Sequence, residues 1–279
     1  MEEAVTFGAD DGLLGVYTPA QGDLCCLLMN AGVIHRIGPH RLNVKLARGL
    51  AEGSVASLRF DLSGLGDSRP PSGSASYTEQ SVVDLRAAMD FVERRYGKKR
   101  FVIFGICSGA VNAQRAALAD ARVAGIFMLD GFWYTSRWTR TALLWARLRA
   151  HSPKTLLGAV LRKLFRRRHT AAAPVAPKKV EIFATDGSGN PPKPQFIAEM
   201  EQLTTRGVDV FFLYSGSVDD LVSYRGQLRD AFPGAEFIRR SRIERHPDLD
   251  HTAMTQHSQK KMVAMVRDWA RGVAGRDGG

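Results

Sequence analysis

The segment Phe101–Ala110, FVIFGICSGA, holds the clearest candidate for covalent chemistry in the chain. An apolar run of strand length ends at Gly105-Ile106-Cys107-Ser108-Gly109, and an alanine-rich helical stretch follows at once. A nucleophile on a sharp strand-to-helix turn needs small residues two positions before and two positions after it, because the backbones crowd there. The two glycines stand at these positions about Cys107. Such a turn exposes the thiol, and the helix N-terminus with the Ser108 N–H favours a thiolate and then an oxyanion.

Two alternatives stand beside this prediction. Ser108 is the rival nucleophile, but its flanking residues would be Ile106 and Ala110, which fit a tight turn less well. Cys107 could also be only a small buried residue at the end of a strand, which is the usual state of a lone cysteine. The combination of strand, G-x-C-x-G and helix favours Cys107 as the nucleophile.

The elements around this turn predict an α/β fold. Apolar runs of strand length alternate with helical stretches, which is typical of a mostly parallel, eight-stranded sheet with helices on both faces. The expected strands are Ala4–Phe7, Leu13–Tyr17, Asp23–Met29, Val55–Asp61, Phe101–Ile106, Ala124–Leu129, Val208–Tyr214 and Glu236–Arg240. The expected helices are Pro39–Ala51, Glu79–Tyr96, Ser108–Ala119, Gln195–Thr205, Leu221–Ala231 and Thr252–Arg271.

With these motifs in this order, the chain resembles the α/β-hydrolase superfamily. Leu27–Arg41 stands where that family has a strand followed by His-Gly and an oxyanion loop, and Ser57–Ser68 is similar to its Asp-x-x-Gly-x-Gly-x-Ser turn. A cysteine at the turn resembles dienelactone hydrolase and thioesterase-like members. The loop N-A-G-x-x-H-R-x-G-P-x-R and the C-S-G-A turn also resemble hydrolases associated with exosortase and exopolysaccharide gene clusters.

The resemblance implies a Cys-His-Asp triad. The base should follow the last strand, which identifies His251, with His246 and His257 as weaker candidates. The acid should follow Val208–Tyr214, where Asp219 has the family's G-x-x-D spacing. Asp219 could instead cap the next helix, and Asp220 and Asp130 are the alternative acids. Asp61 and Asp67 belong to a turn that some relatives use structurally.

The predicted oxyanion loop departs from the family pattern, because Asn30-Ala31-Gly32 replaces His-Gly. The oxyanion donors would be the N–H of Ser108 and that of Gly32 or Val33, and Gly32 is favoured because glycine permits unusual backbone torsions. His35 and Arg36 are candidate substrate-binding residues. Asn30 and His35 could equally serve only the structure of the loop.

The net charge of +11 is concentrated in one segment. Between Gly131 and Val180 there are 12 Lys and Arg and no Asp or Glu, so the remainder has 27 basic and 28 acidic residues. We expect residues 131–194 to form a cap inserted between core segments 1–130 and 195–279. The simpler interpretation is that this cap is an amphipathic cover over the pocket. The alternative is that its positive charges form a docking site for an acidic carrier protein, an anionic glycan or lipid. The locality of the charge makes nucleic acid an unfavoured partner.

The sequence therefore predicts a hydrolase or acyltransferase that acts on an ester or thioester through an acyl-cysteine. The alternatives are an inactive member of the fold that holds an anionic partner, and a peripheral membrane protein. Neither a metal site nor a cofactor is predicted. No apolar run reaches the roughly 20 residues of a membrane span, and the polar N-terminus is unlike a signal peptide. Three cysteines, with Cys25 and Cys26 in a buried strand, fit a reducing cytoplasm.

Overall fold

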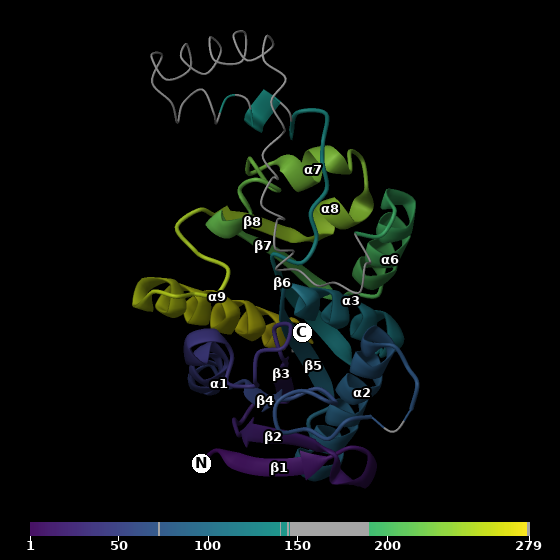
Figure 1. Ribbon diagram of the computed structural model, residues 1–279, viewed down its shortest axis with the longest axis vertical. Helices are drawn as coiled ribbons and strands as arrows, with labels where there is room; N and C mark the ends of the chain where they lie inside the picture. The colour runs from purple at the N-terminus through teal and green to yellow at the C-terminus, as the bar shows by residue number, and fades with distance from the viewer. Residues whose placement is uncertain (72, 140, 144, 146–189, 278–279) are drawn as a thin grey trace, which may run out of the picture.

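The computed structural model describes residues 1–71, 73–139, 141–143, 145 and 190–277, and it contains one eight-stranded sheet. The strand order is β1-β2-β4-β3-β5-β6-β7-β8 (Figure 1). β1 pairs with β2 and β2 with β4 in antiparallel fashion, whereas every pair from β4 to β8 is parallel. The strands are β1 (Glu3–Phe7), β2 (Leu13–Thr18), β3 (Leu24–Leu28), β4 (Ala56–Phe60), β5 (Arg100–Ile106), β6 (Val123–Leu129), β7 (Asp209–Ser215) and β8 (Arg242–His246). The predicted fold class is confirmed.

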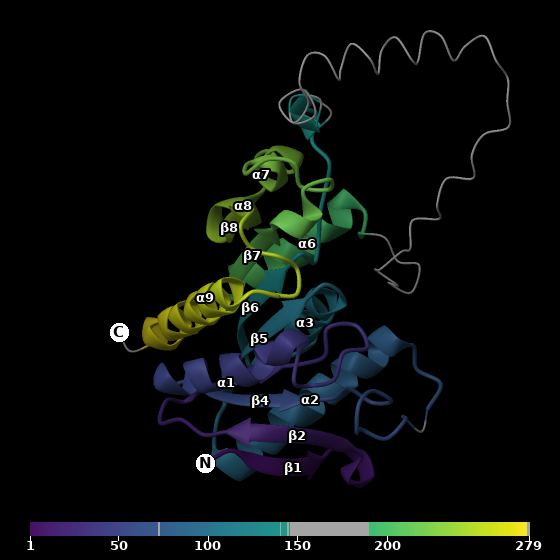
Figure 2. The same cartoon turned by 60° about the vertical axis from the view of Figure 1, so that its left-hand side comes forward.

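Helices cover both faces of the sheet because the central strands are buried on both sides. Every residue of β3 and β4 is buried, as expected for parallel strands between two helical layers. One apolar core lies under α1 (Leu42–Glu52) and α9 (Gln256–Ala274). The other lies under α2 (Tyr77–Tyr96), α3 (Ser108–Ala119) and α6 (Lys193–Thr205), on the opposite side of the sheet in Figure 2.

Three predicted elements near the C-terminus are wrong in kind or extent. Glu236–Arg240 is helix α8, and the last strand follows it as β8. Of the five residues of β8 only Ile243 is buried, because the strand lies at the edge of the sheet and shows little apolar pattern. The helix expected from Leu221 is only α7 (Gln227–Ala231). The final helix starts at Gln256, where the Thr255 side chain accepts a hydrogen bond from the Ser258 N–H.

The parallel strands bring the residues that follow them to one edge of the sheet. Asn30 follows β3, Asp61 follows β4, Cys107 follows β5, Asp130 follows β6 and His251 lies in the loop after β8. Loops at the carboxyl edge of a parallel sheet are where such folds bind ligands. The polar residues singled out in the sequence therefore meet at this edge.

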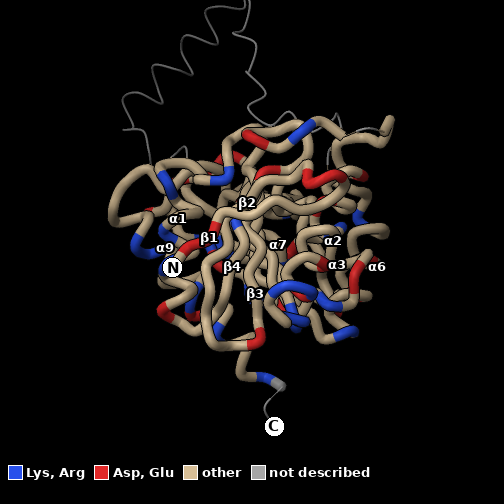
Figure 3. The backbone as a smooth tube through the Cα atoms, turned by 90° about the horizontal axis from the view of Figure 1, so that it is seen from below, with Lys and Arg blue, Asp and Glu red and all other residues tan. Residues whose placement is uncertain are grey.

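Most of the expected cap, residues 131–194, lies outside the described residues. The same holds for eleven of the twelve basic residues counted between 131 and 180. In the rest of the chain both charge signs are scattered over the view of Figure 3. Among the described helices, none has the length and hydropathy required to cross a membrane.

Candidate functional site

Cys107 occupies the turn between β5 and α3 in a backbone conformation that few residues adopt. Its φ of 57° and ψ of −119° are strained for a residue with a Cβ, and such strain is typical of functional sites. The Cys107 N–H donates to the Leu129 carbonyl at 2.9 Å, and its carbonyl accepts from the Ala110 N–H at 3.0 Å. The thiol is free and half-buried. Cys107 therefore stands at the junction of the two elements, and Ser108 is the first residue of the helix.

Glycine makes this turn possible. A Cβ on Gly105 would lie 2.3 Å from the Gly109 carbonyl oxygen, a backbone atom that cannot move aside. A Cβ on Gly109 would meet the Asn30 carbonyl oxygen at 3.2 Å, which is tight but less severe. Gly131 adds a third close approach, since its Cβ would lie 2.2 Å from that of Ala110. The first two glycines stand where the sequence predicted crowding, and the third was not foreseen.

His251 lies between Cys107 and a buried carboxylate. Its Nδ1 is 2.8 Å from Asp130 Oδ2, and its backbone N–H donates to Ser217 Oγ at 2.9 Å. A hydrogen bond also links its side chain with Cys107. Burial disfavours the charged imidazolium, but the hydrogen bonds with Asp130 and Cys107 outweigh burial and raise the pKa of His251 to about 9. The imidazole is thus held from both sides, by Asp130 and by Cys107.

The expected contact between His251 and Asp219 is wrong. Asp219 lies beyond the short 3-10 helix Gly216–Val218, and its half-exposed carboxylate accepts from Arg245 Nη2 at 2.6 Å. This short helix turns the chain so that Ser217, two residues earlier, is the one that contacts His251. The carboxylate on His251 belongs to Asp130, one strand earlier than the family position that the sequence suggested. Asp130 is one of the two alternative acids that the sequence offers; Asp220, the other, is exposed.

Asp130 is fixed by more than His251. Its side chain is fully buried, and its carboxylate accepts from the Ser215 N–H at 2.8 Å and from the Ser215 hydroxyl at 2.6 Å. Three donors thus satisfy a carboxylate that would otherwise be costly to bury. Ser215, the last residue of β7, was missed in the sequence. The only signal was a small polar residue at the end of an otherwise apolar strand.

The loop after β3 reaches the Cys107 turn through Gly32. Gly32 has a φ of +57°, and its N–H donates to Ser108 Oγ at 3.2 Å. Asn30, in contrast, is buried and structural: its side-chain oxygen accepts from the Leu62 N–H at 2.7 Å, and its Nδ2 donates to the Ile34 carbonyl at 2.8 Å. The loop therefore carries a glycine N–H beside the turn, held in place by an asparagine beneath it.

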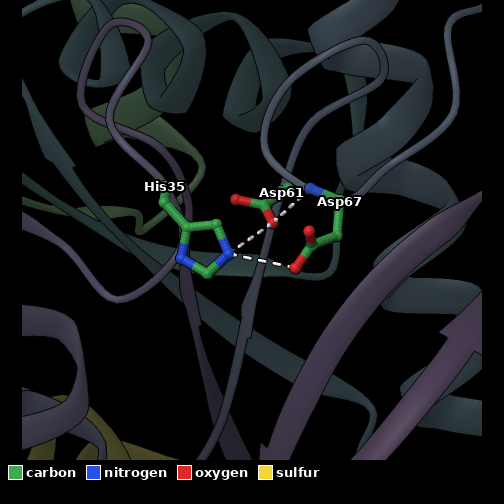
Figure 4. A group of neighbouring side chains, drawn as sticks. All are labelled: His35, Asp61 and Asp67. Atoms are coloured by element: carbon green, nitrogen blue, oxygen red, sulfur yellow. Dashed lines mark hydrogen bonds and ion pairs between the residues drawn. The ribbon is translucent and has the colours of Figure 1, made fainter.

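Asp61 anchors the same loop from the next strand. Its fully buried carboxylate accepts from Asn30 Nδ2 at 2.9 Å and from the Arg36 N–H at 2.6 Å, and it contacts the Arg36 guanidinium. The Arg36 Nη1 also lies 2.7 Å from Asp67, and His35 Nε2 lies 3.2 Å from Asp67 (Figure 4). Hydrogen bonds from Arg36 and His35 lower the pKa of Asp67. His35 and Arg36 are thus engaged by the protein's own carboxylates, which gives no support to the substrate-binding role that we expected.

The His35–Asp61–Asp67 group has the residue types of a metal site, since potential ligand atoms lie within 4.8 Å of one another. Arg36, however, contacts both carboxylates and supplies the positive charge between them. A metal ion would compete with the guanidinium for the same oxygens. The group fits an internal ion-pair cluster that holds the loop better than it fits a metal centre.

The architecture is shared with solved enzymes at low sequence identity. An esterase of Pyrococcus furiosus aligns with a TM-score of 0.62 and 15% identity over 99% of this chain and 91% of its own. A Xanthomonas campestris serine hydrolase described as lacking a lid gives a TM-score of 0.53 and 13% identity over 98% and 94%. The mouse alpha/beta hydrolase domain-containing protein 10 gives 0.54 and 12% over 97% and 99%. At these identities the likeness establishes the fold.

The sequence itself carries the family relationship. None of the curated proteins gives a significant match to this chain. The model of the alpha/beta hydrolase family, in contrast, matches residues 34–265, which include the Cys107 turn, Asp130 and the loop of His251. The chain belongs to the alpha/beta hydrolase family of enzymes.

Proposed function

We propose that this enzyme cleaves or transfers acyl groups from esters or thioesters, with Cys107 as nucleophile, His251 as base and Asp130 as the residue that orients His251. The observation that carries the proposal is the chain of contacts from Asp130 through His251 to Cys107, across three strand ends. An inactive binding protein of the same fold would have no need for a buried carboxylate, a doubly bonded imidazole and a strained cysteine in contact.

The position of His251 supports covalent chemistry at Cys107. An imidazolium beside a cysteine stabilises the thiolate, which is the nucleophilic form. The raised pKa of His251 keeps that positive charge in place through neutral pH. Asp130 holds Nδ1, so the other ring nitrogen, Nε2, is left to face Cys107. Asp130 thus fixes the orientation of the ring and balances its charge.

The reaction then proceeds in two steps. The Cys107 thiolate attacks the carbonyl carbon, and the carbonyl oxygen becomes an oxyanion. As the bond to the leaving group breaks, His251 gives its proton to the leaving oxygen or sulfur, and a thioester to Cys107 remains. His251 next takes a proton from water or from another nucleophile, which attacks the thioester and releases the acyl group. Sulfur regains its negative charge and His251 its proton.

The oxyanion donors in this proposal are the N–H groups of Ser108 and Gly32. Ser108 is the first residue of α3, so its N–H lacks a partner within the helix and points to the N-terminal end. The Gly32 N–H presently donates to Ser108 Oγ at 3.2 Å. A substrate oxygen would replace this hydroxyl as the acceptor. Thioesters are captured readily by amines, so the proposal covers transfer as well as hydrolysis.

We first predict that Cys107→Ala abolishes both turnover and acylation. With a panel of acyl thioesters and activated esters, intact-mass spectrometry should show one acyl adduct on the wild-type protein and none on the variant. The rate should fall at least about 10³-fold, as for other nucleophile deletions. Ser108→Ala keeps its backbone N–H and should still form the adduct. An active Cys107→Ala beside an inactive Ser108→Ala would reverse the assignment.

The two aspartates provide a matched pair of variants. Asp130→Asn should lower kcat about 10²- to 10⁴-fold, because an amide neither balances the imidazolium nor favours the correct tautomer. Asp219→Asn, which loses only a half-exposed ion pair to Arg245, should stay within about 3-fold of wild type. Thermal melting of both variants controls for folding. Equal losses of kcat would mean that Asp130 has no special part in the reaction.

The raised pKa of His251 also predicts a pH dependence of stability. The folded protein holds this proton to about pH 9, whereas the unfolded chain releases it near pH 6.5. The stabilisation is therefore complete below pH 6.5 and is lost as the pH rises to 9. Relative to His251→Gln, the free energy of unfolding of the wild type should fall by about 3 kcal/mol across this interval. The free energies of unfolding would be measured by urea titration at each pH. If they depend on pH equally in the two proteins, the raised pKa of His251 is contradicted.

A further inference from the structure

The loop between β3 and α1 exposes apolar side chains beside Cys107. Val33 is 83% exposed, and Ile34 and Ile37 are 38% and 40% exposed. The loop is tied to the turn of the nucleophile, because the preceding Gly32 donates its N–H to Ser108 Oγ. Single exposed apolar residues are ordinary on a protein surface. Three within five positions, fixed next to a reactive group, form a patch that a ligand can use.

Two further exposed apolar residues come from other elements around the same group. Met254, which is 64% exposed, follows His251 by three positions and is held by hydrogen bonds of its N–H to Asp250. Tyr77 begins α2 and is 40% exposed. Burial raises the pKa of Tyr77 and Asn112 lowers it, and smaller contributions from Asp84 and Cys107 show that the phenol lies within electrostatic range of the sulfur. Exposed apolar side chains thus come from three segments, each tied to Cys107 or to its neighbour Ser108: the β3–α1 loop through Gly32, the loop of His251, and Tyr77.

The charged groups of this loop do not offer an alternative binding mode. Arg36 is only 13% exposed at its side chain, and its guanidinium contacts both Asp61 and Asp67. The imidazole of His35 also contacts the Asp67 carboxylate. Two carboxylates thus occupy the Arg36 guanidinium, a cation of the same loop as Val33, and a substrate carboxylate or phosphate would have to displace them. The loop therefore selects against an anionic acyl group and leaves its apolar side chains to make the contact.

We propose that Val33, Ile34, Ile37, Tyr77 and Met254 bind the alkyl chain of the acyl group, so that the substrate is an ester or thioester of a medium-length or longer hydrocarbon chain. This inference rests on the proposed acyl chemistry of Cys107. An acyl chain bonded to Cys107 would start next to the Gly32–Ser108 contact, His251 and Tyr77; the other apolar side chains follow Gly32 or His251 closely in the sequence. Each methylene that leaves water gains up to about 0.8 kcal/mol, equivalent to about fourfold in binding.

The test varies the acyl chain at a constant leaving group. With p-nitrophenyl acetate, butyrate, hexanoate and octanoate, kcat/KM of the wild type should rise about 2- to 4-fold per methylene, and thus at least about 60-fold over the six methylenes from acetate to octanoate. Val33→Asp should lower the ratio of octanoate to acetate kcat/KM at least about 10-fold. The matched control is Val83→Asp, on the exposed side of α2, which should leave the ratio unchanged. The ratio cancels any effect common to both esters.

Two results would overturn the inference. One is a wild-type ratio near one, which would mean that the acyl chain does not touch this surface. The other is a ratio in Val33→Asp equal to that in Val83→Asp; if both esters slow equally, the patch contacts a second copy or another protein. Failure of the proposed chemistry looks different, since ester cleavage would then survive Cys107→Ala. If turnover requires Cys107 but does not depend on the length of the acyl chain, the acyl-chain site is contradicted and the proposed chemistry of Cys107 is not.

Discussion

The close approach of β5 and α3 at Cys107 is the constraint on which the rest of the site depends. The backbone reverses within one residue, and Cys107 takes up that change with a φ of 57°. The reversal requires Gly105, where any Cβ would meet backbone atoms, and it requires Gly131 against Ala110. The Cys107 N–H is bonded to the Leu129 carbonyl of β6. The end of β6 is therefore fixed beside the turn. Because Asp130 directly follows Leu129, Asp130 must also lie next to Cys107.

Two buried carboxylates hold the segments on either side of the Cys107 turn in place. Asp130 takes its donors from Ser215 and His251, and Asp61 takes its donors from Asn30 and Arg36. A buried polar group without its partner costs about 1–3 kcal/mol, and a charged one more. Each carboxylate thus tolerates few arrangements of its neighbours. Asp130 fixes the imidazole, and Asp61 fixes the loop that carries the Gly32 N–H and the apolar patch.

The fold and half of the site could be predicted because their signals are local. Cys107 stands in a run of ten residues that predicts a strand, a turn and a helix, and His251 follows directly from the order of motifs. The carboxylate that contacts His251 could not be chosen in this way. Aspartates follow both β6 and β7, and the outcome depends on the short helix at Gly216–Val218, which sends Asp219 to Arg245. β8 could not be predicted from the sequence either. It is an edge strand with only one buried residue, so its sequence lacks the alternation of apolar and polar residues that is typical of a strand.

The central claim is that Asp130, His251 and Cys107 act as one unit, and a double-mutant cycle tests it most directly. The rate of Cys107 acylation would be measured in wild type, Asp130→Asn, His251→Asn and the double variant. If Asp130 acts only through His251, its loss should add nothing once His251 is gone, and the double variant should acylate as slowly as His251→Asn alone. Losses that multiply across the two sites would contradict the account.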